Sequence, residues 1–185
     1  KEDYARHVLD RLDGQVKVLE REKEPEDIFS KLMQMLNTVD MVRPHVPDIA
    51  NDKAREVCGA VVEHFDRTVQ SQKCLELGRR LLSGTLWPRR LMPLRDRVAT
   101  AEKIAAQTRS VYIVNYRFGD YLTDYARKND CSSALAGPIG VLSLRRDALE
   151  RAYVDTEDYV ERNFRFRRLG DPEPNPRDKI PTGKW

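Results

Sequence analysis

The chain has 185 residues, of which 40% are hydrophobic and 34% are charged, so it is long enough for one domain with a sizeable core. Its longest apolar segment, residues 132–144, is interrupted by Gly137, Pro138 and Gly140, and it is shorter than the ~18–20 apolar residues of a membrane-spanning helix. The net charge of +3 is too small to indicate a nucleic-acid-binding protein by itself.

The first two predicted elements are amphipathic helices. Residues 2–23 carry apolar side chains three or four positions apart, namely Tyr4, Val8, Leu12, Val16 and Leu19. Pro25 ends this helix and begins the second, because proline suits a first helical turn and Glu26 and Asp27 there complement the helix dipole. The second helix carries Ile28, Phe29, Leu32, Met33, Leu36 and Val39. Residues 43–52 contain two prolines and are predicted to form a loop.

Three further helices are predicted over residues 53–82, 94–128 and 141–166. Between the first two, Pro88 and Pro93 bracket a turn that we expect to display Trp87 together with Arg89 and Arg90. Residues 128–140 contain two glycines and a proline and are predicted to form a loop. The fold class is therefore all-α, an irregular bundle of about five helices.

The aromatic-rich stretch 109–125 has two interpretations. Val111, Phe118, Leu122 and Tyr125 follow a helical rhythm, which continues the apolar stripe of residues 94–108 and predicts burial. A strand over residues 110–116 is the alternative, because Val111, Ile113 and Val114 favour strands. The helix is preferred because the sequence offers no second convincing strand as a pairing partner.

The last 17 residues, 169–185, hold four prolines and cannot form regular ladders. We expect one helical domain over residues 1–168 and an extended tail over 169–185. Trp185 is either an anchor for a partner's pocket or part of a tail that folds back onto its own domain.

Motifs for common chemistries are absent from the sequence. It contains no phosphate-cradling glycine loop, no nucleophile elbow and no CxxC pair. The three cysteines suit a reducing compartment, and Cys58 and Cys74, which lie among helical residues, are expected to be small hydrophobic free thiols. Carboxylate pairs such as Asp120 and Asp124, and the neighbours Cys58, His64 and Asp66, fit solvated or structural positions better than catalytic ones. We therefore predict no catalytic residue, no cofactor and no metal.

Charge is distributed in blocks. Residues 1–66 hold 10 Lys or Arg against 15 Asp or Glu, whereas residues 67–128 hold 13 against 5. Such blocks favour packing between acidic and basic parts of the chain, or docking against charged partners, including phosphates and anionic lipids. The residues predicted to bind partners are the arginines of the basic clusters and two tryptophans: Arg79, Arg80, Trp87, Arg89, Arg90, Arg165, Arg167, Arg168 and Trp185.

Residues 66–82, DRTVQSQKCLELGRRLL, followed by TRSVYIVNYRFGDYL at 108–122, resemble the peroxin-eleven family of peroxisome-elongating proteins. Asp66, Arg67, Arg109, Arg117, Phe118 and Gly119 would fill that family's motif positions. The resemblance implies a helical, membrane-associated protein without catalytic activity.

The function favoured by these observations is a non-enzymatic structural or accessory subunit of a larger protein assembly. Other protein subunits are its expected partners, an anionic membrane surface is a possible one, and RNA is less favoured. The expected setting is intracellular and reducing, with a mitochondrial membrane-associated complex favoured over the peroxisome or cytoplasm. The alternatives are an RNA- or ribosome-binding protein that uses the arginine clusters, and a peripheral membrane-shaping protein of the peroxin-eleven type.

Overall fold

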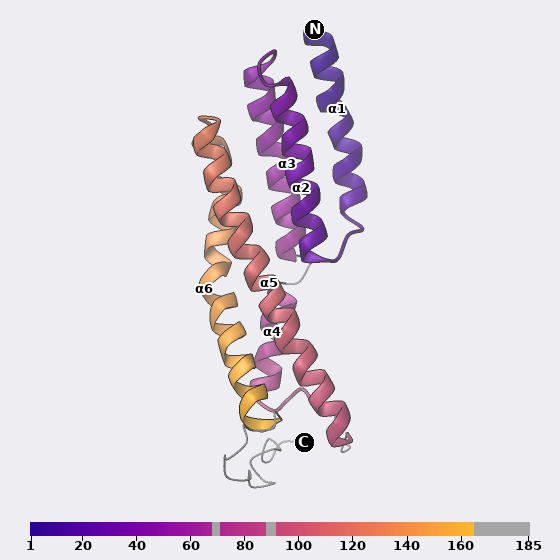
Figure 1. Cartoon of the computed structure of the whole chain (residues 1–185), viewed down its shortest axis with the longest axis vertical. Helices are drawn as coiled ribbons and strands as arrows, with labels where there is room; N and C mark the ends of the chain where they lie inside the picture. The colour runs from indigo at the N-terminus through magenta and orange to yellow at the C-terminus, as the bar shows by residue number, and fades with distance from the viewer. Residues whose placement is uncertain (68–70, 88–91, 165–185) are drawn as a thin grey trace, which may run out of the picture. The chain divides into compact units, whose positions relative to one another are not determined.

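The structure, a computed structural model, describes residues 1–67, 71–87 and 92–164. These residues form six α-helices and no strand (Figure 1), which confirms the predicted all-α fold. The helices are α1 (Glu2–Leu19), α2 (Pro25–Val42), α3 (Pro47–Arg67), α4 (Ser71–Leu82), α5 (Leu94–Lys128) and α6 (Ser132–Asn163). The predicted tail, residues 169–185, lies outside the described residues.

Contacts within the chain divide it into two compact units. Unit 1 comprises Lys1–Ser71 and Ile113–Arg146, and unit 2 comprises Gln72–Tyr112 and Asp147–Trp185. Helices α5 and α6 therefore contribute residues to both units. A single domain over residues 1–168 stays a prediction.

Two proline residues begin helices. Pro25 is the first residue of α2, as predicted, and Glu24 before it has the extended backbone of an N-cap, with φ −84° and ψ 123°. Pro47 begins α3 in the same way, so the loop predicted over residues 43–52 ends earlier than expected. The single helix predicted over residues 53–82 appears as α3 and α4, and residues 68–70 between them are not described.

Helices α4 and α5 both end in a left-handed residue that satisfies their last carbonyl groups. Gly84 has φ 73°, and the Thr85 N–H then donates to the Arg80 carbonyl oxygen at 3.0 Å. Asp130 has φ 53°, and the Cys131 N–H donates to the Ala126 carbonyl oxygen at 2.9 Å. The second of these turns is short, so α6 begins only four residues after the end of α5.

The prediction of a loop over residues 128–140 is wrong, because α6 begins at Ser132 and contains Pro138. Proline inside a helix removes one backbone hydrogen bond and costs about 3 kcal/mol. Leu135 and Leu142, about one turn to either side of Pro138, are 0% and 2% exposed. Burying two leucine side chains contributes a stabilisation of similar size, about 3–6 kcal/mol, so tertiary packing keeps this segment helical.

The core of unit 1 forms where α5 meets the helices of the N-terminal half. Helices α1, α2 and α3 pack against one another (Figure 1). Phe118 of α5 lies 4.8 Å from Phe29 of α2 and 5.0 Å from Phe65 of α3, measured between ring centroids. Leu122 and Tyr125 are buried on the same side of α5, so the helical interpretation of residues 109–125 is confirmed.

The core of unit 2 is smaller. Its buried residues come from α4, α5, α6 and the segment that follows α4: Leu81, Trp87, Ala101, Ile104, Ala105 and Val160. Gly78 of α4 also belongs here, since a Cβ at this position would lie 3.4 Å from the methyl group of Thr156 on α6. Small residues on α4 and α5 thus allow close approach of the helices in this unit.

We expect Phe118→Ala to lower the free energy of unfolding by about 3–5 kcal/mol, because it leaves a cavity between three helices. Ile113→Ala is the matched control on the same helix, since Ile113 is 37% exposed and its loss should cost less than about 1 kcal/mol. Urea unfolding followed by circular dichroism measures both changes. Equal losses from the two variants would contradict the central place of Phe118 in the core.

Candidate functional site

A groove of about 710 Å³ lies between α1 and α2 in unit 1. Its floor contains buried Leu12, Leu19 and Met35, while Val18 on its wall is 61% exposed. A Cβ at Gly14 would meet no atom within 4 Å, so glycine keeps part of the groove open. The remaining lining residues are Val8, Arg11, Gln15, Lys31, Gln34 and Thr38.

The charged side chains that line this groove are both cationic. Lys31 donates to the Glu22 carboxylate at 2.8 Å, whereas Arg11 forms no ion pair within the described part of the chain. An apolar floor with cations at its edge suits an amphipathic helix that carries acidic residues beside its apolar stripe. The sequence pattern contains no signal for this groove, because the groove depends on how far α1 and α2 separate.

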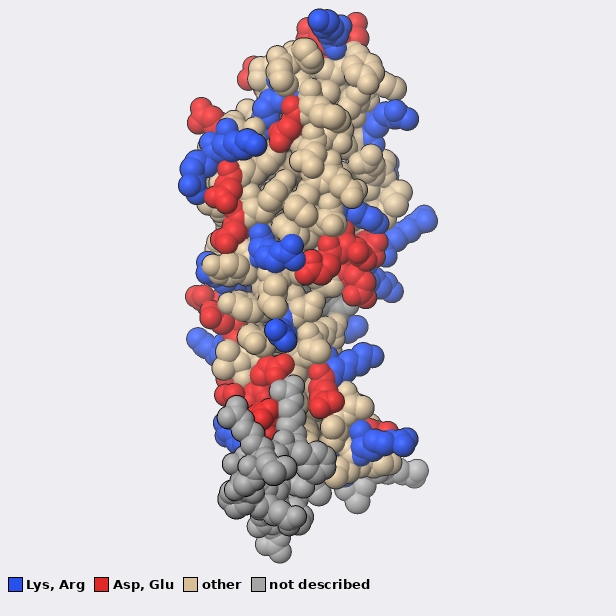
Figure 2. Space-filling model, viewed as in Figure 1, with Lys and Arg blue, Asp and Glu red and all other residues tan. Residues whose placement is uncertain are grey.

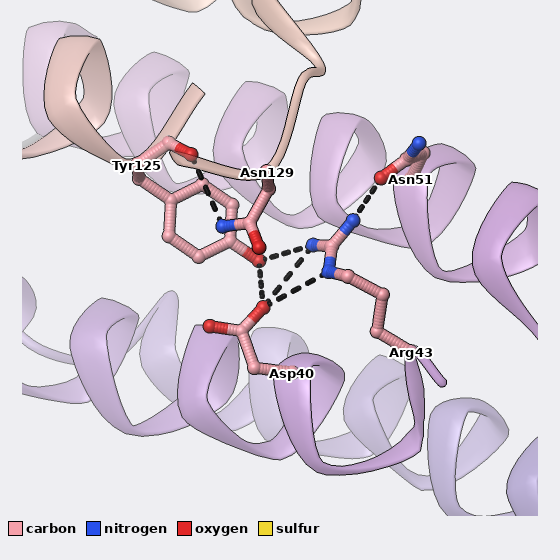
Figure 3. Close-up of polar contacts among 5 residues, drawn as sticks. All are labelled: Asp40, Arg43, Asn51, Tyr125 and Asn129. Atoms are coloured by element: carbon pink, nitrogen blue, oxygen red, sulfur yellow. Dashed lines mark hydrogen bonds and ion pairs between the residues drawn. The ribbon is translucent and has the colours of Figure 1, made fainter. Parts of the chain in front are cut away.

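A cluster of polar side chains joins α2, α3 and α5 in unit 1 (Figure 3). Arg43 donates to the Tyr125 hydroxyl at 2.6 Å, to the Asp40 carboxylate at 3.2 Å and to the Asn51 side-chain oxygen. The Tyr125 hydroxyl in turn donates to Asp40 at 2.7 Å, and the Asn129 amide donates to the Tyr125 carbonyl at 3.1 Å. Each charged group in the cluster thus has its partners inside it.

Burial raises the pKa of Tyr125, and its hydrogen bond to Asp40 raises it further, so the phenol stays neutral at physiological pH. Arg43 opposes this rise without reversing it. The cluster therefore joins three helices through hydrogen bonds and an ion pair.

We expect Tyr125→Phe to lower the free energy of unfolding by about 1–2 kcal/mol, because Asp40 and Arg43 each lose one buried hydrogen bond. Tyr4→Phe is the control, since Tyr4 is 71% exposed and its hydroxyl should contribute less than about 0.5 kcal/mol. Thermal unfolding at constant pH compares the two. No loss in Tyr125→Phe would show that water replaces the hydroxyl and that the cluster does not stabilise the fold.

Cys58 and Cys74 are free and buried, as predicted, and Cys131 is free and buried as well. Burial raises the pKa of Cys58 to about 12 and that of Cys74 to about 11. Burial also raises the pKa of Cys131, against the charge of Arg43. His64 and Asp66 do not activate Cys58, because His64 contacts the Glu22 carbonyl oxygen at 2.8 Å and Asp66 accepts from Arg145 at 3.0 Å.

These pKa values predict slow alkylation of the native thiols. Relative to a thiol with the ordinary pKa of 9.0, Cys58 has roughly a thousandfold less thiolate at mildly alkaline pH. Iodoacetamide should therefore label Cys58 and Cys74 only after unfolding, as mass spectrometry of the peptides would show. Ser133→Cys supplies an exposed thiol on α6 that should react at once; equally fast labelling of Cys58 would exclude a buried, inert role.

The sequence-predicted partner residues are not brought together into one site. Arg79 and Arg80 are exposed on α4, and Arg79 pairs with Glu76. Trp87 is only 6% exposed and belongs to the core of unit 2, so the expectation that a turn displays it is wrong. A large aromatic next to proline looked like an exposed anchor, but the apolar sides of α4 and α5 bury it. Arg89, Arg90, Arg165, Arg167, Arg168 and Trp185 lie outside the described residues.

Many arginines in the described ranges form ion pairs with carboxylates. These are Arg6, Arg43, Arg55, Arg67, Arg79, Arg95, Arg117, Arg127 and Arg145. Lys and Arg side chains are interspersed with Asp and Glu on the face drawn in Figure 2, and do not gather into one basic area there. The positive charge of the paired arginines is directed to the chain's own carboxylates.

No group of three or more His, Cys, Asp and Glu side chains in residues 1–67, 71–87 and 92–164 is placed to hold a metal ion. Among the described helices, none has a stretch that is both long and apolar enough to cross a bilayer.

No protein-family model, curated protein or solved structure matches the chain significantly. The resemblance to the peroxin-eleven family therefore stays a prediction. Three of the residues that carry it have roles in the core and surface of unit 1: Asp66 pairs with Arg145, Arg117 pairs with Glu26, and Phe118 is buried.

Proposed function

We propose that the protein is a non-enzymatic accessory subunit of a larger protein assembly, and that the groove between α1 and α2 receives a partner helix. The observation that carries this proposal is the groove itself. Its volume is about 710 Å³, its floor is apolar, and Arg11 and Lys31 are among its lining residues. Apolar surfaces of this kind on soluble domains commonly mark interaction sites. The fitting partner is an amphipathic helix with acidic residues at the edge of its apolar stripe.

The arrangement of charge supports a protein partner over RNA. Binding to a nucleic-acid backbone needs several cations free to contact phosphates. Arg43 after α2, the arginines of α3 and those of the second half of α5 are instead paired with carboxylates, for example Arg117 with Glu26 at 2.8 Å. Arg11, which pairs with no described carboxylate and lies beside an apolar groove, suits a single acidic helix better than a long phosphate backbone.

The wider setting that we propose is an organellar assembly, in the mitochondrion and near a membrane surface. Three buried free thiols fit a reducing compartment there.

We expect Val18→Glu to reduce recovery of the partner about tenfold or more when the tagged full chain is isolated from native cells, because a carboxylate would face the partner's acids inside an apolar groove. Met41→Glu is the matched control: Met41 is 70% exposed on α2 and does not line the groove. Quantitative mass spectrometry of co-purified proteins measures both.

The proposal is supported if at least one co-purified protein is recovered much less with Val18→Glu but equally well with Met41→Glu. If every co-purified protein is recovered equally with both variants, the groove is not the docking surface. Recovery that is abolished by ribonuclease treatment would favour the RNA-binding alternative.

A further inference from the structure

A second, smaller pocket of about 70 Å³ lies between α5 and α6 within unit 1. Its polar lining consists of Asn115, Asp120 and Thr123 from α5, with Ser143 and Arg146 from α6. The volume accommodates about two water molecules, each of which takes up roughly 30 Å³ in the liquid. A carboxylate group fits this space.

Asn115 is the unusual residue of this pocket. Its side chain is 2% exposed, and its amide nitrogen has no hydrogen-bond partner among the residues that the structure describes. Leaving a buried amide donor unpaired costs free energy that a hydrophobic residue of similar size would avoid. An acceptor atom supplied from outside the chain would satisfy it.

Arg146 lines the same pocket and carries a positive charge. Its guanidinium lies 4.3 Å from the centroid of the Tyr116 ring, and it forms no ion pair with a described carboxylate. Its neighbour Arg145, by contrast, is paired with Asp66 at 3.0 Å. A guanidinium stacked on an aromatic ring keeps its N–H groups free for two-point binding of an oxyanion.

The other polar groups divide between helping and opposing an anion. The Ser143 hydroxyl lines the pocket as a further possible donor. The Thr123 hydroxyl is committed to the Gly119 carbonyl oxygen at 2.7 Å. Asp120 is exposed at the edge and repels anions, so binding depends on Arg146 and Asn115 together.

We propose that this pocket binds the side-chain carboxylate of an aspartate or glutamate from a protein partner. Arg146 and the Asn115 amide both donate to the carboxylate oxygens. A polypeptide is the favoured source, because residues 132–144 of α6 carry no charge and expose Val141 and Leu144, the latter 81% exposed. A segment lying on these side chains can place one acidic residue in the pocket. This inference rests on the proposed function, because the acidic residue would come from the protein partner proposed there.

The experiment uses the ¹⁵N-labelled full chain and three probes: N-acetyl-glutamate amide, its neutral counterpart N-acetyl-glutamine amide, and inorganic phosphate. The glutamate probe should shift the Asn115 side-chain NH₂ and Arg146 Nε–H signals with saturation, and the glutamine probe should not. Arg146→Gln should weaken this binding about tenfold or more, while Arg127→Gln, on an exposed arginine paired with Asp124, should leave it unchanged.

Asn115→Leu gives an independent readout. It removes the unpaired donor, so the urea midpoint should stay equal or rise while binding of the glutamate probe is lost; a large fall in the midpoint would show that Asn115 stabilises the fold and would contradict the proposal.

Three results of the titration would overturn the proposal: no saturable shift, equal shifts with the glutamine probe, or binding of phosphate alone. Because the purified chain and small probes are used, this result does not depend on whether a partner occupies the groove between α1 and α2.

Discussion

The contact of Phe118 with Phe29 and Phe65 fixes how α5 lies against the N-terminal helices of unit 1. Once this ring is buried, the helical repeat decides the environment of every neighbouring residue on α5. Leu122 and Tyr125 follow it into the core, and Asn115, three residues earlier, falls at the boundary between the core and the pocket shared with α6. Both polar sites of unit 1 are thus consequences of one aromatic contact.

The two polar sites differ in how completely their charges are satisfied. In the cluster around Arg43, the guanidinium contacts Asp40, Asn51 and Tyr125. Arg146 has an aromatic ring below it and no described carboxylate as partner. A saturated cluster lowers the free energy of the folded chain alone, whereas an unsaturated donor pair lowers it only when an acceptor arrives. The first arrangement fits a structural role and the second fits recognition.

Local sequence patterns predicted the parts of the fold that depend on periodicity. The stripe through Phe118, Leu122 and Tyr125, and the start of α2 at Pro25, are read directly from residue spacing. The local preferences of Pro138 and Trp87 predict a loop and an exposed turn. Burial by residues distant in sequence outweighs these preferences, so Pro138 lies inside α6 and Trp87 lies in the core of unit 2. The contact between Arg43 and Tyr125, 82 residues apart, leaves no local signal. The unpaired amide of Asn115 is equally silent, since an asparagine among aromatics forms no motif.

Arg11 and Arg146 are two of the cations of unit 1 that pair with no described carboxylate, and each lines a hollow with exposed apolar side chains beside it. An isolated surface charge costs little in water. When a partner excludes that water from the edge of an apolar surface, the attraction between an unpaired cation there and an acidic group of the partner becomes stronger. In the complexes that we propose, exposed Val18 and Leu144 supply the area to be buried, and the two arginines favour acidic residues at its edge. An acidic, amphipathic polypeptide is therefore the partner that we propose for both surfaces, with a helix in the groove and one carboxylate in the pocket.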